Sequence, residues 1–318
     1  MERMLDWSAK FPSMRVRIFF HIRWLLIAMS LTAAEHGDRA YRGEIQKWRK
    51  NYEANLRQDN GWLTLAGLFW LKEGNNRFGA GLGNDIVLPE GSAPEKAGTF
   101  IFHHGNTRLL AQHGVPVLLN GKPVLAEMPL KPDTTGQPDR IALGRLSMIV
   151  IQRGSRHGIR LWDNANRARR DFRGTHWFPV TESHRLTARF VSYPQPKMIP
   201  IVNVLGDIDP NPSPGYAEFE IDGKPCRLEP VLEGNELFFL LKDLTSGKQT
   251  YPAGRFLYTD LPKDGKVILD FNKAHNPPCA FTAFATCPLP PRQNYLPVPI
   301  DAGELNYEHP SDTAAPAK

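Results

Sequence analysis

Two of the three cysteines in this 318-residue chain lie near its C-terminus, beside a histidine and an aspartate. Asp270, His275, Cys279 and Cys287 offer oxygen, nitrogen and sulfur donors, and zinc accepts such sets in tetrahedral geometry. The same residues could supply a thiol nucleophile with a neighbouring base, which requires a cysteine of lowered pKa. They predict a metal- or thiol-dependent hydrolase, with zinc or no cofactor.

A disulfide between Cys279 and Cys287 is the competing interpretation. In an exported protein, two cysteines eight positions apart can close one loop, which leaves Cys226 as the odd thiol. The spacing of the histidine and the cysteines fits no standard zinc finger. The disulfide, two plain buried cysteines, the metal site and the nucleophile all remain open at this point.

The segment Arg153–Arg173 carries seven arginines and two aspartates, a local charge of +5. Guanidinium groups bind carboxylates and phosphates in a bidentate fork and stack on aromatic rings. These residues predict a cleft of arginine and aromatic side chains that binds a small anionic or polar ligand. The alternative is a set of solvated loop charges. The candidate ligand-binding residues are Arg160, Asp163, Arg173, Trp177, Tyr251, Arg255 and Tyr258.

The elements that must position these groups read as strands. Short apolar or alternating runs, among them residues 146–151, 157–162, 186–193, 216–221, 236–241 and 255–258, are separated by Gly, Asn and Pro. Asn120-Gly121, Asp222-Gly223 and Asp264-Gly265 are signals for tight turns. The predicted fold class is all-β: two antiparallel β-sandwich or barrel modules with one N-terminal amphipathic helix.

The N-terminus has the layout of a secretory leader over residues 1–34. A basic stretch from Met14 precedes the apolar run Trp24–Leu31 and the small residues Thr32–Ala34. The apolar core of about ten residues is too short to span a bilayer, which takes about 20. We therefore expect export to the periplasm or outside the cell, no transmembrane span in the mature chain, and translation from Met1 or Met14.

An amphipathic helix is predicted over residues 40–60, where apolar residues recur at spacings of three and four.

Charge and motifs exclude several functions. Beyond residue 34 the chain holds 34 basic and 31 acidic residues, a net charge of +3, which is too small to predict nucleic-acid binding. The chain contains no nucleophile-elbow motif, no His-Glu-x-x-His motif and no dinucleotide-binding glycine motif before a helix. No reaction is therefore assigned.

Residues 61–150 resemble a forkhead-associated (FHA) β-sandwich domain. Gly79, Asn84-Asp85-Ile86, Leu88, Ala97 and Asn120-Gly121 occupy positions of the family pattern. The resemblance implies phosphothreonine binding through an Arg, a Ser and an Asn, with a His bracing the loop. Here Ala80, Ala93 and Lys96 stand where the Arg, Ser and His would be, and alanine supplies no donor for phosphate. We expect an FHA-like scaffold that binds no phosphothreonine peptide.

Residues 155–306 resemble the bacterial and archaeal domain-of-unknown-function family 1684, and residues 307–318 read as a loose tail. The matching stretches are Arg160–Asp163, Phe172–Pro179, Asp243–Tyr258, the segment from Asp270 through Val298, and Ala302–Glu304. The resemblance implies a second β-rich module but no activity.

Overall fold

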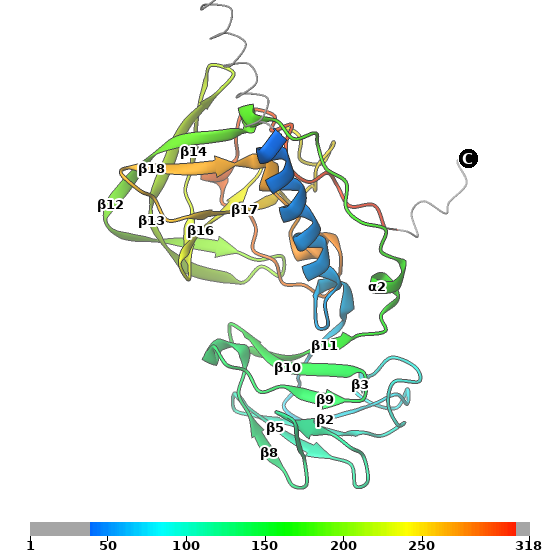
Figure 1. Ribbon diagram of the computed structural model, residues 1–318. Coiled ribbons are helices and arrows are strands. Elements are labelled where there is room, and N and C mark those ends of the chain that lie inside the picture. Colours follow the sequence, from blue (N-terminus) through cyan, green and yellow to red (C-terminus); the bar gives the residue numbers. More distant parts are fainter. Residues whose placement is uncertain (1–38, 310–318) are drawn as a thin grey trace, which may run out of the picture. The chain divides into compact units, whose positions relative to one another are not determined.

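Strands dominate residues 39–309, the part of the chain that this computed structural model describes (Figure 1). They form several sheets with mainly antiparallel pairing, and residues 39–57 are helical. The predicted all-β class with one N-terminal helix is confirmed, and none of the sheets in the described range closes into a barrel. Residues 48–318 cluster as one unit, separate from residues 1–47. The predicted leader lies outside the described residues.

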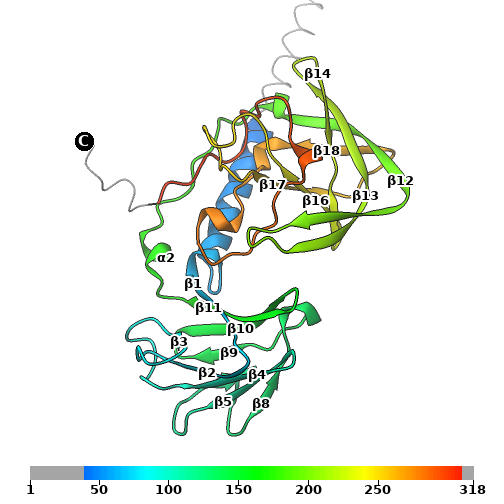
Figure 2. The ribbon, with the colours of Figure 1, turned by 180° about the vertical axis from the view of Figure 1, so that it is seen from behind.

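The FHA-like part is a sandwich of two sheets, seen from opposite sides in Figures 1 and 2. One sheet has the order β1 (Leu65–Trp70), β11 (Arg156–Asp163), β10 (Leu146–Arg153), β9 (Ile141–Leu143), β6 (Leu118–Leu119) and β7 (Lys122–Pro123). The other has the order β3 (Ile86–Val87), β2 (Gly74–Gly79), β4 (Gly98–His103), β5 (Asn106–Ala111) and β8 (Met128–Leu130). Only the pair β2–β3 is parallel.

Alternation along β11 decides which of its side chains can reach a ligand. Ile159 and Leu161 belong to the core between the two sheets, whereas Trp162 packs in a second cluster on the other face of the sheet. Successive side chains of a strand point to opposite faces, so Arg160 shares the outer face with Trp162.

The sequence predicts that the second module begins at residue 155. In the structure, β11 pairs with β1 and β10, and its inward side chains complete the core of the first sandwich.

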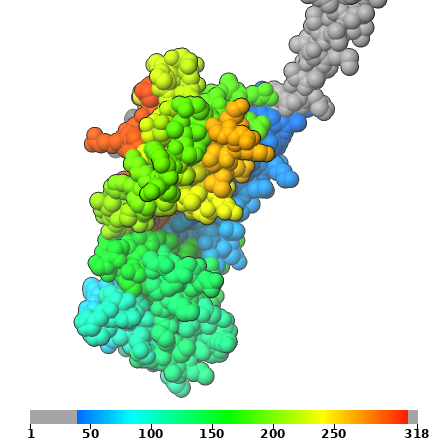
Figure 3. All heavy atoms as spheres, turned by 90° about the vertical axis from the view of Figure 1, so that its left-hand side faces the viewer, coloured from blue at the N-terminus to red at the C-terminus, as the bar shows by residue number. Residues whose placement is uncertain are grey.

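A second group of strands follows in two further sheets. The larger sheet has the order β14 (Lys224–Leu228), β13 (Ile208–Ile221), β12 (Arg185–Val202) and β18 (Lys266–Asp270). The smaller sheet has the order β15 (Val231–Glu233), β16 (Glu236–Leu241) and β17 (Arg255–Asp260). Figure 3 shows the orange residues of β18 against the green residues of β12, with which they pair.

Apolar side chains from both of these sheets share one core. Phe190 of β12, Leu228 of β14 and Phe239 of β16 are buried in it, and the C-terminal residues Val298 and Ile300 complete it. Burying one such side chain contributes about 1.5–3 kcal/mol. The C-terminal segment is therefore an integral part of this core.

Helices are short in the rest of the described chain, and none of the described helices is long and apolar enough to span a membrane. One α-helix, α2 (Arg167–Asp171), follows β11, and Asn166 caps it by accepting the backbone N–H of Ala168. The 3-10 helices are η1 (Trp62–Thr64), η2 (Asp133–Thr135), η3 (Glu182–His184), η4 (Phe271–Lys273), η5 (Pro278–Ala280) and η6 (Arg292–Asn294).

Candidate functional site: a cavity of arginine and aromatic side chains

A cavity of about 420 Å³ lies within the unit of residues 48–318. Four of the residues predicted to be functional line it: Arg160, Tyr258, His275 and Cys287. Further aromatic side chains form much of its wall, namely Tyr52, Trp62, Phe238, Phe256 and Phe281. The cavity combines an apolar wall with a few polar groups, which is typical of sites for small organic molecules.

The pairing of β16 with β17 sets the aromatic wall. Phe256 and Tyr258 lie two positions apart on β17, so their side chains emerge on the same face. Phe238 of β16 is the register partner of Tyr258, and the two rings stack with centroids 4.5 Å apart and an interplanar angle of 8°. The wall is therefore built on two paired strands, which fix its shape.

Arg160 is the buried cation of the cavity. Its Nη2 donates to Thr286 Oγ1 at 3.3 Å, and its guanidinium carbon lies 5.8 Å from the centre of the Trp62 ring. The Nε–H is buried without a hydrogen-bond partner. Burial and the nearby charge of Arg153 lower the pKa of Arg160. No carboxylate among the described residues forms an ion pair with it: nearby Asp133 is paired with Arg153, and Glu233, which lines the same cavity, accepts the hydroxyl of Tyr258.

Arg153 differs from Arg160, although both reach Thr286. Its Nη1 forms an ion pair with Asp133 Oδ2 at 2.8 Å, and its Nε donates to Thr286 Oγ1 at 3.3 Å. It also borders a second cavity of about 690 Å³, whose lining includes Asp133, Asp207 and Glu233. The charge of Arg153 is therefore already paired, and Arg160 is the cation available to a ligand.

His275 presents a neutral imidazole to the cavity. Its backbone pairs with Phe256, and its Nδ1 lies 3.1 Å from the carbonyl oxygen of Lys273. A carbonyl only accepts, so Nδ1 carries the proton and Nε2 keeps its lone pair. Burial lowers the pKa of His275 to about 4. The ring stacks on Tyr258 at an interplanar angle of 15°.

The two C-terminal cysteines lie side by side as free thiols. The backbone N–H of Cys279 donates to Cys287 Sγ at 3.1 Å, and Cys279 Sγ lies 3.6 Å from the carbonyl oxygen of Ala285. The side-chain interaction between the two thiol groups lowers the pKa of Cys279 and raises the pKa of Cys287. Cys226 is buried in the core of the larger sheet, where burial raises its pKa. Cys279 and Cys287 are therefore neighbours, but no disulfide joins their sulfur atoms.

The four expected metal donors do not form one cluster. Asp270 accepts from the backbone N–H and the side-chain amide of Asn272, both at 3.2 Å, and thereby caps η4. Within residues 39–309, the only set of three or more His, Cys, Asp or Glu donors lying within 4.8 Å of one another is Glu73, His103 and His104. The local turn at η4 uses the carboxylate, which keeps Asp270 from joining the thiols.

The remaining predicted ligand-binding residues do not line the cavity. Asp163 is buried against Arg145, whose Nε lies 2.9 Å from its Oδ1. Arg255 is fully buried and donates to Asp243, Ile300 and Ala302. Arg173 is exposed, Trp177 donates its indole N–H to Thr175, and Tyr251 packs with Phe172 and Phe281.

Sequence reasoning missed several residues of the cavity. Arg153 lies in the arginine-rich segment and Tyr52 on the apolar stripe of the helix, but neither pattern shows that they face the same hollow. Thr286, which binds both arginines, lies between the cysteines and carries no signal of its own. Only folding brings these three segments together.

The loops that bind phosphothreonine in FHA domains have local partners here. Asn120 donates to Asp139 Oδ1 at 2.7 Å and accepts the backbone N–H of Arg140 at 2.9 Å. Asn84 donates to the carbonyl oxygens of Gly81 and Glu95, each at 2.7 Å. These amides hold turns together.

Comparison with known proteins finds a family that the second group of strands matches. Residues 170–305 match the family described as "Protein of unknown function (DUF1684)". No curated protein matches the chain. The match begins at residue 170, so the predicted family stretch Arg160–Asp163 lies outside it, in β11.

Solved structures similar to the chain fall into two groups. An uncharacterized protein of Haloarcula marismortui, solved by solution NMR, is 30% identical, with a TM-score of 0.36; the match covers 43% of this chain and 78% of that one. The FHA domain of FhaA, solved in complex with the intracellular domain of Rv3910, is 18% identical over 30% of this chain and 96% of that one, with a TM-score of 0.22. The FHA domain of Rv0020c is 18% identical over 30% of this chain and 94% of that one, with a TM-score of 0.21.

The similarity to the DUF1684 family of proteins of unknown function thus extends over residues 170–305 of the chain.

Proposed function

We propose that the protein binds a small organic anion, a carboxylate joined to an aromatic or other apolar group, in the cavity that contains Arg160. The observation that carries this proposal is the buried guanidinium of Arg160, which has one hydroxyl partner and no carboxylate among the described residues. A buried charge without a counterion is costly, and a ligand that supplies the counterion recovers that cost.

The walls of the cavity favour an amphipathic ligand over inorganic phosphate. Stacked Phe238 and Tyr258 offer an apolar surface, and His275 Nε2 offers an acceptor for a hydroxyl or amine of the ligand. A volume of about 420 Å³ lies within the range of small-molecule sites, about 300–1,000 Å³. Arg160, Phe238 and Tyr258 line the same cavity, so one ligand with a ring and a carboxylate can contact both kinds of group.

Calorimetric titration with phenylacetate, and with 2-phenylethanol as its neutral analogue, tests this function. We expect saturable binding of phenylacetate and much weaker binding of the alcohol. Charge-assisted hydrogen bonds contribute about 1.5–3 kcal/mol, so Arg160→Met should weaken phenylacetate binding at least about tenfold. The matched control is Arg173→Met, which removes an exposed arginine and should bind as the parent does.

Stability separates a ligand-binding role of Arg160 from a structural one. Because its charge is uncompensated, Arg160→Met should not lower the melting temperature of the ligand-free protein. Equal binding of the acid and the alcohol, or unchanged phenylacetate binding by Arg160→Met, would contradict the proposal.

We also propose that the FHA-like sandwich serves as a scaffold and that the protein is exported. The first point rests on Ala80 and Ala93, and the second on the leader pattern of residues 1–34. Surface plasmon resonance against a phosphothreonine peptide library should detect no binding. N-terminal sequencing of the natively purified protein should begin near Glu35, and a start at Met1 or Met14 would refute export by cleavage.

A further inference from the structure

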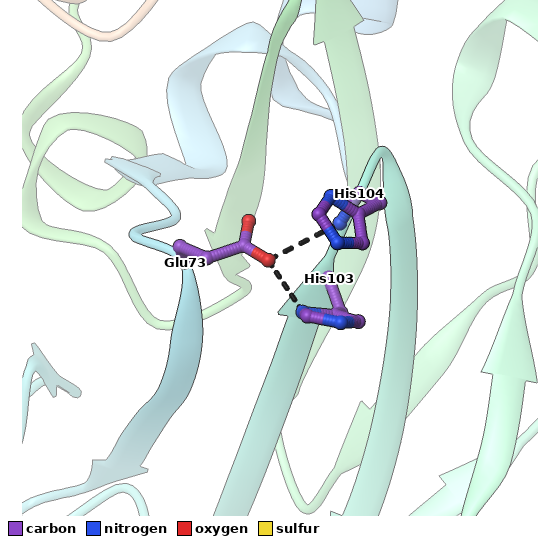
Figure 4. A group of neighbouring side chains, drawn as sticks. All are labelled: Glu73, His103 and His104. Atoms are coloured by element: carbon purple, nitrogen blue, oxygen red, sulfur yellow. Dashed lines mark hydrogen bonds and ion pairs between the residues drawn. The ribbon is translucent and has the colours of Figure 1, made fainter.

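We propose that Glu73, His103 and His104 form a binding site for a divalent transition-metal ion, with Zn²⁺ and Cu²⁺ as the favoured ions. The site lies on the FHA-like sandwich, where the turn between β1 and β2 approaches the turn between β4 and β5 (Figure 4). Their donor atoms all lie within 4.8 Å of one another. The proposal is independent of the function proposed for the Arg160 cavity.

The sheet register brings the first two ligands together. In the antiparallel pair β2–β4, Gly74 lies opposite Phe102 and Asn75 opposite Ile101. Continued by one residue, the same register places Glu73 opposite His103, and cross-strand neighbours have Cβ atoms about 4.5–5.5 Å apart. Glu73 Oε1 lies 2.5 Å from His103 Nδ1 and also accepts the backbone N–H of His104 at 3.3 Å. Their proximity is therefore a property of the β-sheet.

The turn between β4 and β5 supplies the third ligand. His104 and Gly105 form the two-residue loop between His103 and Asn106, with φ values of 46° and 78°. Two positive φ values define a loop that favours Asn-Gly, and histidine is one of the few other residues that accept the first position. The conformation places the two imidazole rings with centroids 4.1 Å apart. The turn therefore aligns a third donor with Glu73 and His103.

The donor set selects the ion. Two imidazoles and one carboxylate suit Zn²⁺ and Cu²⁺, whereas Mg²⁺ and Ca²⁺ prefer oxygen ligands. Zinc bonds of about 2.0–2.1 Å bring tetrahedral donors to about 3.3 Å from one another. Reaching that geometry needs only a small opening of the contact between Glu73 and His103, whose side chains are 54% and 69% exposed and free to adjust. Three protein ligands leave a fourth position for water.

Isothermal titration of the full-length chain with ZnCl₂, CuCl₂ and MgCl₂ at pH 7.5 tests the site. We expect binding of Zn²⁺ and Cu²⁺ and none of Mg²⁺. His103→Ala and Glu73→Gln should each weaken Zn²⁺ binding at least about tenfold, because each removes a ligand. The matched control is His113→Ala, which removes another exposed histidine of the same sandwich and should bind Zn²⁺ as the parent does.

The thiols need a separate control, because Cys279 and Cys287 are themselves soft donors. In the chain carrying Cys279→Ser and Cys287→Ser, Zn²⁺ binding that remains sensitive to His103→Ala supports the site. Binding that disappears with the cysteines, or that is unchanged in both His103→Ala and Glu73→Gln, overturns the proposal. All three ligands are exposed, so the melting temperatures of the metal-free variants should match the parent, and a loss of binding then reports the loss of a ligand.

Discussion

Two buried arginines show how a single residue's partners decide its role. Arg255 is fully buried, like its partner Asp243, and its Nη2 lies 2.9 Å from Asp243 Oδ2 and 3.0 Å from the carbonyl oxygen of Ile300. Arg160 is also buried, but it has only the Thr286 hydroxyl and a distant ring. The paired arginine therefore holds the C-terminal segment in place, and the unpaired one is the candidate for binding a ligand.

Replacing Arg255 should destabilise the protein strongly. Arg255→Met leaves Asp243 as a buried, unpaired carboxylate, which typically costs about 3–5 kcal/mol. The free energy of unfolding from urea denaturation measures this cost. Arg173→Met serves as the control, because substitution of an exposed residue usually changes stability by less than about 0.5 kcal/mol. A loss below about 1 kcal/mol for Arg255→Met would show that the buried pair is not needed.

The sequence predicted a ligand site that contains arginines, but it did not indicate which of the arginines line the cavity. Arg160 and Arg173 adjoin apolar strand residues, and Arg255 lies near aromatic residues at a strand entrance, so all three are predicted to face a ligand. In the structure Arg160 does line the cavity, Arg173 is exposed, and Arg255 faces a core. The difference depends on Asp243 and the carbonyl oxygens of residues 300 and 302, which only the fold brings to Arg255.

The tight turns that connect strands in β-hairpins could be predicted from the sequence. Asn120, Asp222 and Asp264 all have φ near 50°, and each precedes a glycine with positive φ. Such pairs suit two-residue hairpin loops whatever surrounds them, because the preference is local. The predicted hairpin at Asp222-Gly223 joins β13 to β14 in the structure.

The long ribbon of β12 and β13 could not be predicted in this way. The expected strands covered only residues 186–193 and 216–221, because prolines at 194, 196, 200, 210, 212 and 214 read as loop. In the structure the pairing continues from Lys197 opposite Ser213 to Val202 opposite Ile208, and Pro200 lies opposite Pro210. Proline fixes φ near −65°, which an extended ribbon accepts wherever no N–H is needed for the ladder.

At the scale of elements, Gly303 should be indispensable for docking the C-terminal segment. Its φ is +82°, and an added Cβ would lie 2.4 Å from the carbonyl oxygen of Ala274 and 2.8 Å from that of Phe271. Gly265 has φ +69° but open space around it. Both Gly→Ala variants pay about 1–2 kcal/mol for the left-handed backbone, and only Gly303→Ala adds a clash with backbone atoms. Urea denaturation should therefore show a larger loss for Gly303→Ala, and equal losses would contradict this packing.

On the scale of the whole molecule, two groups around one loop make the folding stability depend on pH in opposite senses. Glu304 is fully buried, and its Oε2 accepts the backbone N–H of Asn276 at 2.7 Å. Burial raises the pKa of Glu304 to about 8. The neighbouring His275 has a pKa lowered to about 4, also by burial. Between about pH 4.5 and 6.5 the folded protein therefore keeps Glu304 protonated and His275 neutral, whereas an unfolded chain has an ionised glutamate and a protonated histidine.

The sign of each effect follows from proton linkage. Glu304 stabilises the folded state fully below pH 4.5, and this stabilisation is lost as pH rises toward 8, because the unfolded chain releases its proton first. His275 behaves oppositely, since its contribution is present above pH 6.5 and is lost as pH falls toward 4. The two slopes oppose each other between about pH 4.5 and 6.5, and Glu304 acts alone between about pH 6.5 and 8.

The free energy of unfolding should therefore respond to Glu304→Gln in a pH-dependent manner. From pH 6.5 to 8, the parent should lose up to about 1.4 kcal/mol per pH unit relative to Glu304→Gln, which carries no titrating proton at this position. Urea denaturation at half-unit pH intervals gives both profiles, and Glu308→Gln, which changes an exposed carboxylate of the same segment, should parallel the parent. Parallel profiles for the parent and Glu304→Gln would mean that Glu304 is ionised in the folded protein, with a partner that offsets its burial.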